Sequence, residues 1–208
     1  MTPPPVDQVR PRIEGDREQQ ILDAALAVLV EVGYDRLTMD AVATAARASK
    51  ATLYRRWNSK AALVSEALVS RRGPLQTPDT GSLRGDLVAM FCGPHGMTDG
   101  SQTAMLAAVL TAVTRDEEFA TEFRARFLEP KLALATAVFR RAQERGEVRA
   151  DLDTDLIAPL LPSVAIHRHL MVGLPVDEEF IARVVDEVVL PLACPAGATG
   201  STGSTDPR

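Results

Sequence analysis

Apolar residues recur along most of the chain at the three- and four-residue spacing of amphipathic α-helices. Within residues 17–34 they form one stripe, and Gly33 is placed to end this helix. The stripe consists of Ile21, Ala25, Val28, Leu29 and Val32. After residue 73 a helical period or a capped helix start returns in the segments 82–91, 102–116, 116–146, 154–173 and 177–193. The pattern therefore predicts an all-α protein.

Three prolines, Pro130, Pro159 and Pro162, lie inside these helical patterns. A proline supplies no backbone N–H and crowds the preceding turn. We therefore expect bends or broken helix starts at these positions.

Residues 38–60 predict two short helices joined by a tight turn. Thr38 precedes MDAVATAA and Ser49 precedes KATLYRR, and each hydroxyl can accept a hydrogen bond from an N–H in the first turn of its helix. About three to four residues, Arg47 and Ala48 among them, remain for the connection, which is the length of a helix-turn-helix. Proteins use this organisation to present a helix to DNA.

Positive charge is concentrated in the same segment. The chain as a whole carries a net charge of −5, yet residues 1–72 carry +2 and residues 73–208 carry −7. Between residues 47 and 60 there is no Asp or Glu, and the five basic residues are Arg47, Lys50, Arg55, Arg56 and Lys60. Attraction to phosphate depends on local clustering of basic residues, so the acidic total does not exclude a DNA-binding surface. A solvated helix face is the alternative that the charge alone leaves open.

The side-chain order of the second helix is that of a helix that reads DNA. Leu53 and Trp57 are four residues apart and should point into the core, and for Trp57 we favour packing over stacking on bases. We expect Lys50, Thr52 and Arg55 to contact base edges or adjacent phosphates. The residues expected mainly to position the DNA backbone are Thr38, Ser49, Tyr54 and Lys60, the last at a helix N-terminus that suits a phosphate.

The stretch GYDRLTMDAVATAARASKATLYRRWNSKAALV, residues 33–64, resembles the DNA-binding domain of the TetR/AcrR-type transcriptional regulators. The resemblance runs from about Asp16 to Leu68 and rests on the joint agreement of spacing, helix caps and aromatic positions. It implies an N-terminal three-helix helix-turn-helix domain followed by a larger helical domain for ligand sensing and dimerisation. It also implies a homodimer that binds double-stranded DNA and responds to a small-molecule effector.

Two residues depart from the family pattern. Arg47 stands where the family usually has the turn glycine, and a side chain in the left-handed conformation costs on the order of 1 kcal/mol. Arg47 is therefore either a strained substitute for glycine or an added phosphate contact, and the sequence does not decide between them. Trp57 replaces the usual Phe and needs a partner for its indole N–H.

Composition suggests the domain boundaries. Residues 1–15 are rich in Pro, Gly and charge and predict a mobile arm, in which Arg10 and Arg12 either reach DNA or belong to a tail without contacts. We expect the DNA-binding domain in residues 16–72, the regulatory and dimerisation domain in 73–193, and a flexible tail in 194–208.

Two segments near the C-terminus are apolar on more than one side. Residues 156–166 are apolar on nearly all sides, and residues 180–192 carry two adjacent stripes. Such helices must bury two faces, either against a second subunit or in the deep core of a monomer. The residues expected in a dimer interface are Leu160, Val164, His167, Met171, Phe180, Val184 and Val188.

The middle helices contain soft apolar side chains that either line an effector pocket or fill a dry core. The candidate pocket residues are Met90, Phe91, Met105, Phe119, Phe123, Phe127 and His167. His167 and His169 are two residues apart on a helix, which is poor spacing for metal ligands, so we expect no metal and no cofactor.

Other functional classes find little support in the sequence. The chain has no GxSxG, Gly-rich phosphate loop, HExxH or CxxC motif, so we expect no enzymatic activity. It has two cysteines, no apolar run long enough for a membrane span and no signal peptide, which predicts a cytoplasmic protein. The sequence thus favours a sequence-specific regulator, most simply a repressor released from a palindromic operator by its effector. A non-specific architectural DNA binder and a helical enzyme without a recognisable motif are the alternatives.

Overall fold

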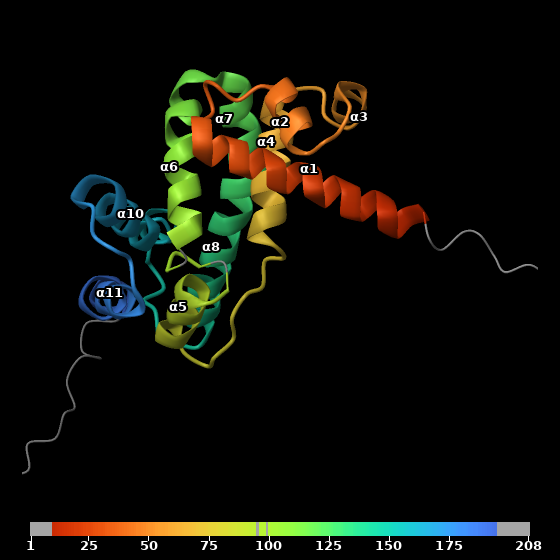
Figure 1. The fold of residues 1–208 in the computed structure, drawn as a ribbon. Coiled ribbons are helices and arrows are strands. Elements are labelled where there is room, and N and C mark those ends of the chain that lie inside the picture. Colours follow the sequence, from red (N-terminus) through yellow and green to blue (C-terminus); the bar gives the residue numbers. More distant parts are fainter. Residues whose placement is uncertain (1–9, 95, 99, 195–208) are drawn as a thin grey trace, which may run out of the picture. The chain divides into compact units, whose positions relative to one another are not determined.

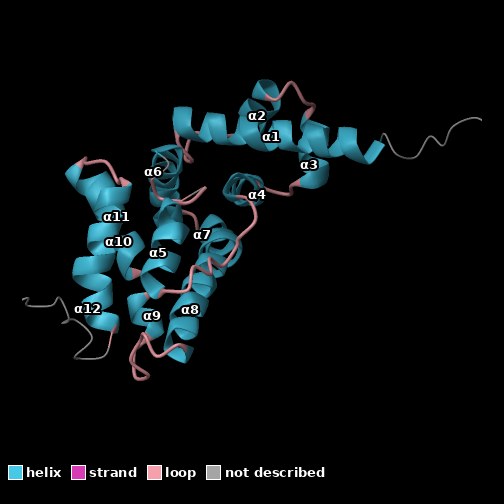
Figure 2. Cartoon of the chain, turned by 90° about the horizontal axis from the view of Figure 1, so that it is seen from below, coloured by secondary structure: helices cyan, strands magenta, loops and turns pink. Residues whose placement is uncertain are grey.

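The structure, a computed structural model, describes residues 10–94, 96–98 and 100–194, with side chains from residue 15 onward except 100–104 and 106. These residues form helices and no strand (Figure 1, Figure 2). The expected all-α fold is confirmed. Within the described part of the chain, no helix has the length and apolar character needed to cross a membrane.

The helices are labelled α, and the π-helical turns within them η. Their bounds are α1 Arg10–Val32, α2 Met39–Ala45, α3 Lys50–Arg56, α4 Lys60–Arg72, α5 Leu83–Cys92, α6 Gly100–Arg115, α7 Glu117–Phe123, η2 Arg124–Leu128, α8 Glu129–Glu144, α9 Thr154–Ile157, α10 Leu160–His167, η3 Arg168–Val172, α11 Glu178–Val184, η4 Val185–Val189 and α12 Leu190–Ala193. Helix α1 begins at Arg10, so residues 10–15 of the expected arm are helical. Pro11 is compatible with this because a proline is tolerated in the first turn. The rest of the arm, 1–9, and the tail residues 195–208 lie outside the described residues.

Prolines shape two of the helix junctions. Pro159 separates α9 from α10, as expected, whereas Pro162 sits within the first turn of α10, where a missing N–H costs little. Pro130 follows the π-helical turn η2. The Arg126 carbonyl lies four residues before Pro130 and cannot receive a helical hydrogen bond from it, and Arg72 Nη1 donates to this carbonyl at 3.3 Å.

The chain divides into two compact units. The first comprises Met1–Leu75 and Ser101–Lys131, and the second comprises Gln76–Gly100 and Leu132–Arg208. Residues 101–131, which the sequence pattern assigned to the regulatory domain, thus pack with the first four helices.

In the first unit, α1 lies against α4 and α2, and α2 lies against α3 (Figure 1). Their buried apolar side chains form one core with residues from α6, α7 and η2. Four aromatic rings run through this core in a row: Tyr34, Phe119, Phe123 and Phe127. Successive ring centroids are 4.5, 5.8 and 5.1 Å apart. These contacts join the helix-turn-helix to α7 and η2.

The second unit has its own apolar core, built from α5, α8 and the helices after residue 154. Asp86 lies in it with its side chain fully buried. Its carboxylate accepts hydrogen bonds from the backbone N–H and the hydroxyl of Thr80, and it pairs with Arg141 at 2.9 Å and with Arg145 at 3.4 Å. A buried carboxylate needs such partners because an isolated one would cost several kcal/mol.

Candidate nucleic-acid interface

Side-chain caps set the start of each helix in the helix-turn-helix. Thr38 Oγ1 accepts from the Ala41 N–H, and Ser49 Oγ accepts from the Thr52 N–H, both at 3.1 Å. Ser59 Oγ accepts from the Ala62 N–H at 3.2 Å and starts α4 at Lys60. The caps at Thr38 and Ser49 lie where the sequence pattern predicts them. They fix the direction in which α3 leaves the turn.

The turn between α2 and α3 is built around a left-handed residue. Arg47 has φ 51°, and it is the one non-glycine with positive φ in the described chain. The Ala48 N–H donates to the Ala43 carbonyl at 2.8 Å, and the Arg47 N–H donates to the Thr44 carbonyl at 3.1 Å. This pair of bonds is a Schellman motif, whose left-handed position is usually glycine. The Arg47 carbonyl accepts from Arg17 Nη2 on α1 at 2.6 Å, which braces the turn.

Arg47→Gly is expected to raise the free energy of unfolding by about 0.5–1 kcal/mol, because the Cβ strain outweighs the entropy that a glycine gains on unfolding. Ala45→Gly, an exposed change within α2, is the control and should lower it by about 1 kcal/mol. Chemical denaturation measures both variants. A destabilised Arg47→Gly protein would contradict the strained turn, and an unchanged salt dependence of DNA binding would exclude a phosphate contact of Arg47.

The outer face of α3 is open to solvent. Tyr54 is 55% exposed, and Lys50 and Arg55 are exposed as well. The Lys50 ammonium pairs with the Asp40 carboxylate of α2, a surface contact worth at most about 1 kcal/mol. DNA phosphates or base acceptors can replace such a partner easily. The half-buried Thr52 shares a hydroxyl hydrogen bond with Ser49 at 2.8 Å.

The inner face of α3 is locked to α4 by Glu66. Leu53 and Trp57 are buried, which confirms the packing role of Trp57. Trp57 Nε1 donates to Glu66 Oε2 at 3.1 Å, so the indole has the partner that its burial requires. Arg56 pairs with Glu66 at 3.0 Å and with Glu18 of α1 at 2.9 Å. The Glu66 carboxylate thereby fixes the C-terminal end of α3.

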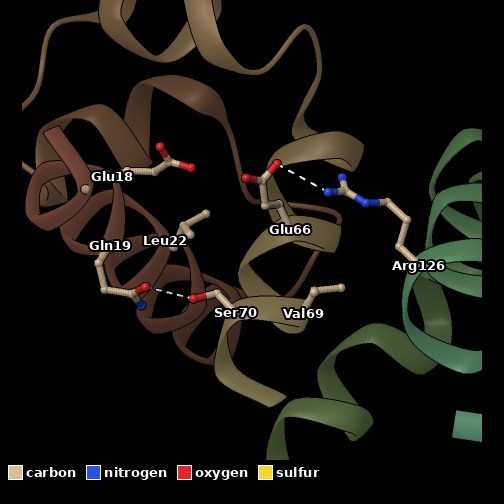
Figure 3. Close-up of a pocket in the computed structure, with 8 residues that line it drawn as sticks. Glu18, Gln19, Leu22, Glu66, Val69, Ser70 and Arg126 are labelled. Carbon is tan, nitrogen blue, oxygen red and sulfur yellow. Dashed lines mark hydrogen bonds and ion pairs between the residues drawn. The ribbon is translucent and has the colours of Figure 1, made fainter. Parts of the chain in front are cut away.

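Glu66 also pairs with Arg126 of η2 at 3.4 Å (Figure 3). Together with Glu18, Leu22, Val69 and other residues of α1 and α4, it lines an open groove of about 450 Å³. The Glu18 and Glu66 carboxylates in this groove already have arginine partners. Glu66 connects α3 with η2, because it pairs with Arg56 at the end of α3 and with Arg126 of η2. The hydrogen bond between Ser70 and Gln19 at 2.8 Å joins α4 to α1 along the same groove.

Lys60 lies at the start of α4 against Tyr34. Its ammonium donates to the Tyr34 carbonyl at 3.2 Å and sits 4.2 Å from the centroid of the Tyr34 ring. Tyr34 Oη donates in turn to Asp116 at 3.0 Å, and Asp116 caps α7. An ammonium has three donors, so Lys60 can hold the Tyr34 carbonyl and a phosphate together. Burial and the hydrogen bond to Asp116 raise the pKa of Tyr34.

The candidate pocket residues do not gather in one unit. Met105, Phe119, Phe123 and Phe127 are buried in the core of the first unit, whereas Met90 and Phe91 pack partly buried against the core of the second. His167 is exposed on α10 in the second unit.

The candidate dimer residues lie on α10, η3, α11 and η4 of the second unit. Met171 is 71% exposed, and Val164 and Val188 are also exposed. Leu160 is partly buried, and Val184 is buried in its own unit. Phe180 is half-buried beneath the Arg168 guanidinium, at 4.3 Å from its ring centroid.

Comparisons with known proteins agree with this geometry. Residues 21–67 match the family model described as bacterial regulatory proteins, tetR family, and residues 77–188 match the model described as tetracyclin repressor-like, C-terminal domain. The chain belongs to the TetR family. It is a helix-turn-helix transcriptional regulator and not an enzyme, as its families and relatives show.

Relatives of this TetR-family chain cover nearly its whole length. The uncharacterized HTH-type transcriptional regulator Rv1556 of Mycobacterium tuberculosis is 37% identical over 194 residues, which is 90% of each chain. The DNA-binding transcriptional repressor TetR of Mycobacteroides abscessus is 37% identical over 181 residues, 86% of this chain and 95% of that one. The crystal structure of the TetR family transcription regulator SCO0332 is 31% identical, covers 86% of this chain and all of that one, and has a TM-score of 0.64.

Proposed function

We propose that the chain is a homodimeric repressor that reads a palindromic operator with α3 and releases it when a small molecule binds. The observation that carries the proposal is the construction of α3: its inner face is fixed by Leu53, Trp57 and Glu66, and its outer face presents Lys50, Tyr54 and Arg55 to solvent. A rigid helix with cations on its free face suits the major groove. Such a protein would act in the cytoplasm, where bacterial DNA lies.

The apolar surface of the second unit supports a homodimer. Helix α10 packs against α11 and η4, and the exposed large apolar side chains of this region include Val164, Met171, Val188 and Leu192. Exposed apolar residues in such number mark an interaction surface, and a two-fold dimer would place two α3 helices on two half-sites. Proteins of the TetR family typically dimerise in this way.

The proposed repressor role is supported by similarity to the DNA-binding transcriptional repressor of Mycobacteroides abscessus. Loss of DNA binding on effector binding would follow if the effector stabilises a dimer shape in which the α3 helices no longer fit the half-sites.

Lys50→Ala is expected to lower the preference for the operator over random DNA by about tenfold or more, because each good base contact is worth about 1–3 kcal/mol. Stability should change little, since the Lys50–Asp40 pair is exposed. Competition binding with operator and random duplexes measures the effect, and Arg140→Ala, an exposed arginine of α8, is the matched control. Unchanged affinity and specificity in Lys50→Ala would remove Lys50 from the reading surface.

A further inference from the structure

Two cations flank one aromatic ring at the end of α4. The Arg72 guanidinium lies 5.7 Å, and the Lys131 ammonium 4.7 Å, from the centroid of the Phe127 ring. All three residues belong to the first unit. Among the described residues, no ion pair joins Arg72 or Lys131 to a carboxylate. The carboxylates of Glu66 and Glu122 pair instead with Arg126, the residue before Phe127. Within the described chain the two cations are therefore compensated by the Phe127 ring and, for Arg72, by two backbone carbonyls, but by no carboxylate.

Both cations are partly shielded from water. Burial lowers the pKa of Lys131, and the neighbouring Arg72 charge lowers it further; burial also lowers the pKa of Arg72. Arg72 Nη1 reaches the carbonyls of Arg126 and Phe127 only at 3.3 Å, and its Nε is buried without any hydrogen-bond partner. A buried N–H donor without a partner beside the half-buried ammonium of Lys131 is costly, and native proteins keep few such groups without a reason.

We propose that Arg72 and Lys131 form the site for the anionic group of the effector, and that the effector is a carboxylate with a small apolar body. The proposal rests on the effector response proposed above. A guanidinium and an ammonium together bind a carboxylate strongly in a site from which water is partly excluded. The Phe127 ring, buried between them, offers the apolar contact for the rest of the molecule.

The position of this site links it to the DNA-binding helices. Arg72 is the last residue of α4, and Lys60 is the first. The ring row leads from Phe127 through Phe123 and Phe119 to Tyr34, on which the Lys60 ammonium rests. A carboxylate that draws Arg72 and Lys131 away from Phe127 thus acts on both ends of α4. The ligand-bound and the DNA-bound protein thus differ in the contacts of Arg72 and Lys131 with Phe127. Because the ligand stabilises one of these two states and DNA the other, ligand binding weakens DNA binding, and DNA binding weakens ligand binding.

Lys131→Met tests the site, since it keeps the side-chain length and removes the charge. Without a carboxylate, this variant should unfold roughly 2–4 °C above the wild type, because it no longer holds a half-buried ammonium without a carboxylate partner beside the Arg72 charge. Benzoate or hexanoate, titrated at constant ionic strength to about ten times its Kd, should raise the unfolding temperature of the wild type by roughly 3 °C or more. The same salts should leave Lys131→Met unmoved and should still stabilise Lys131→Arg.

Neutral analogues and a surface variant provide the controls. Benzamide and hexanamide should give no shift, and Arg124→Met, which removes an exposed cation of η2, should respond to benzoate as the wild type does. Equal shifts with the amides, or an undiminished response of Lys131→Met to benzoate, would overturn the proposal. Inorganic phosphate giving the whole shift, with benzoate and hexanoate giving none, would overturn the organic carboxylate.

DNA binding without a ligand separates this inference from the proposed function. Lys131→Met and the wild type should bind the same operator with the same affinity when no carboxylate is present. Normal operator binding that neither benzoate nor hexanoate weakens, together with no thermal shift, would overturn the anion site and leave the DNA-binding regulator intact. Absence of any preferred DNA sequence in both proteins would instead refute the proposed function.

Discussion

Glu66→Ala is expected to lower the free energy of unfolding by about 2–3 kcal/mol and to weaken operator binding, although Glu66 lies on α4 and not on α3. The change leaves the buried indole N–H of Trp57 without its acceptor, and an unsatisfied buried donor costs about 1–3 kcal/mol. It also removes the carboxylate with which Arg56 and Arg126 pair, and this carboxylate is only 17% exposed. The C-terminal end of α3 then loses its anchor, so its reading face is less well ordered.

Chemical denaturation followed by the fluorescence of Trp57, the single tryptophan of the chain, measures the stability loss. Glu66→Gln keeps an acceptor for the indole and removes the charge, so it should lie between the wild type and Glu66→Ala. Glu31→Ala, an exposed change on α1, is the control and should stay within about 0.5 kcal/mol of the wild type. If Glu66→Ala were as stable as Glu31→Ala, the carboxylate would have no anchoring role.

Asp86→Ala should destabilise the second unit by about 3–5 kcal/mol, the largest effect expected for any single change considered. The reason is that Arg141 and Arg145 would keep their charges beside a buried space from which their common partner is gone. Asp79→Ala is a matched control, because Asp79 pairs with the same Arg141 at 3.8 Å but is 68% exposed. It should cost at most about 1 kcal/mol. Equal losses in the two variants would show that burial of Asp86 is not what matters.

The Asp86 carboxylate should also make the stability of the protein depend on pH in the acidic range. Burial alone would raise the pKa of Asp86, but the hydrogen bonds from Thr80 and Arg141 outweigh it and hold the pKa below its ordinary value. A lowered pKa in the folded state contributes stability above the ordinary pKa near 4, and this stability is lost as the pH falls through the lowered value. The wild type should therefore lose this part of its stability as the pH falls below about 4, and Asp86→Ala should not.

Local features of the DNA-binding domain could be predicted from the sequence. The caps at Thr38 and Ser49 and the left-handed turn at Arg47 depend on residues close in the chain, and all three are present. The partner of the Trp57 indole could be anticipated in kind but not in identity. Glu66 is nine residues away on another helix, and many exposed carboxylates offered the same chemistry.

Contacts between residues far apart in the sequence could not be predicted, and the reason is physical. A helical period shows that Met105, Phe119, Phe123 and Phe127 are buried, but not against which helices, and they pack with the helix-turn-helix. The same holds for Asp86, whose spacing resembles that of a solvent-facing helix residue and whose arginine partners lie 55 and 59 residues later. A signal for Asp86 existed in the Ser82 cap, which places its carboxylate in the first turn of α5.

Selection of bound sequences from a random duplex pool by the wild-type protein tests the central claim most directly. A dimeric reader should enrich a palindrome whose half-sites lie one or more helical turns apart, and it should bind this sequence about a thousandfold or more tightly than random DNA. Enrichment of no sequence, with near-equal affinity for every duplex, would contradict sequence-specific reading by α3 and would favour a non-specific architectural DNA binder.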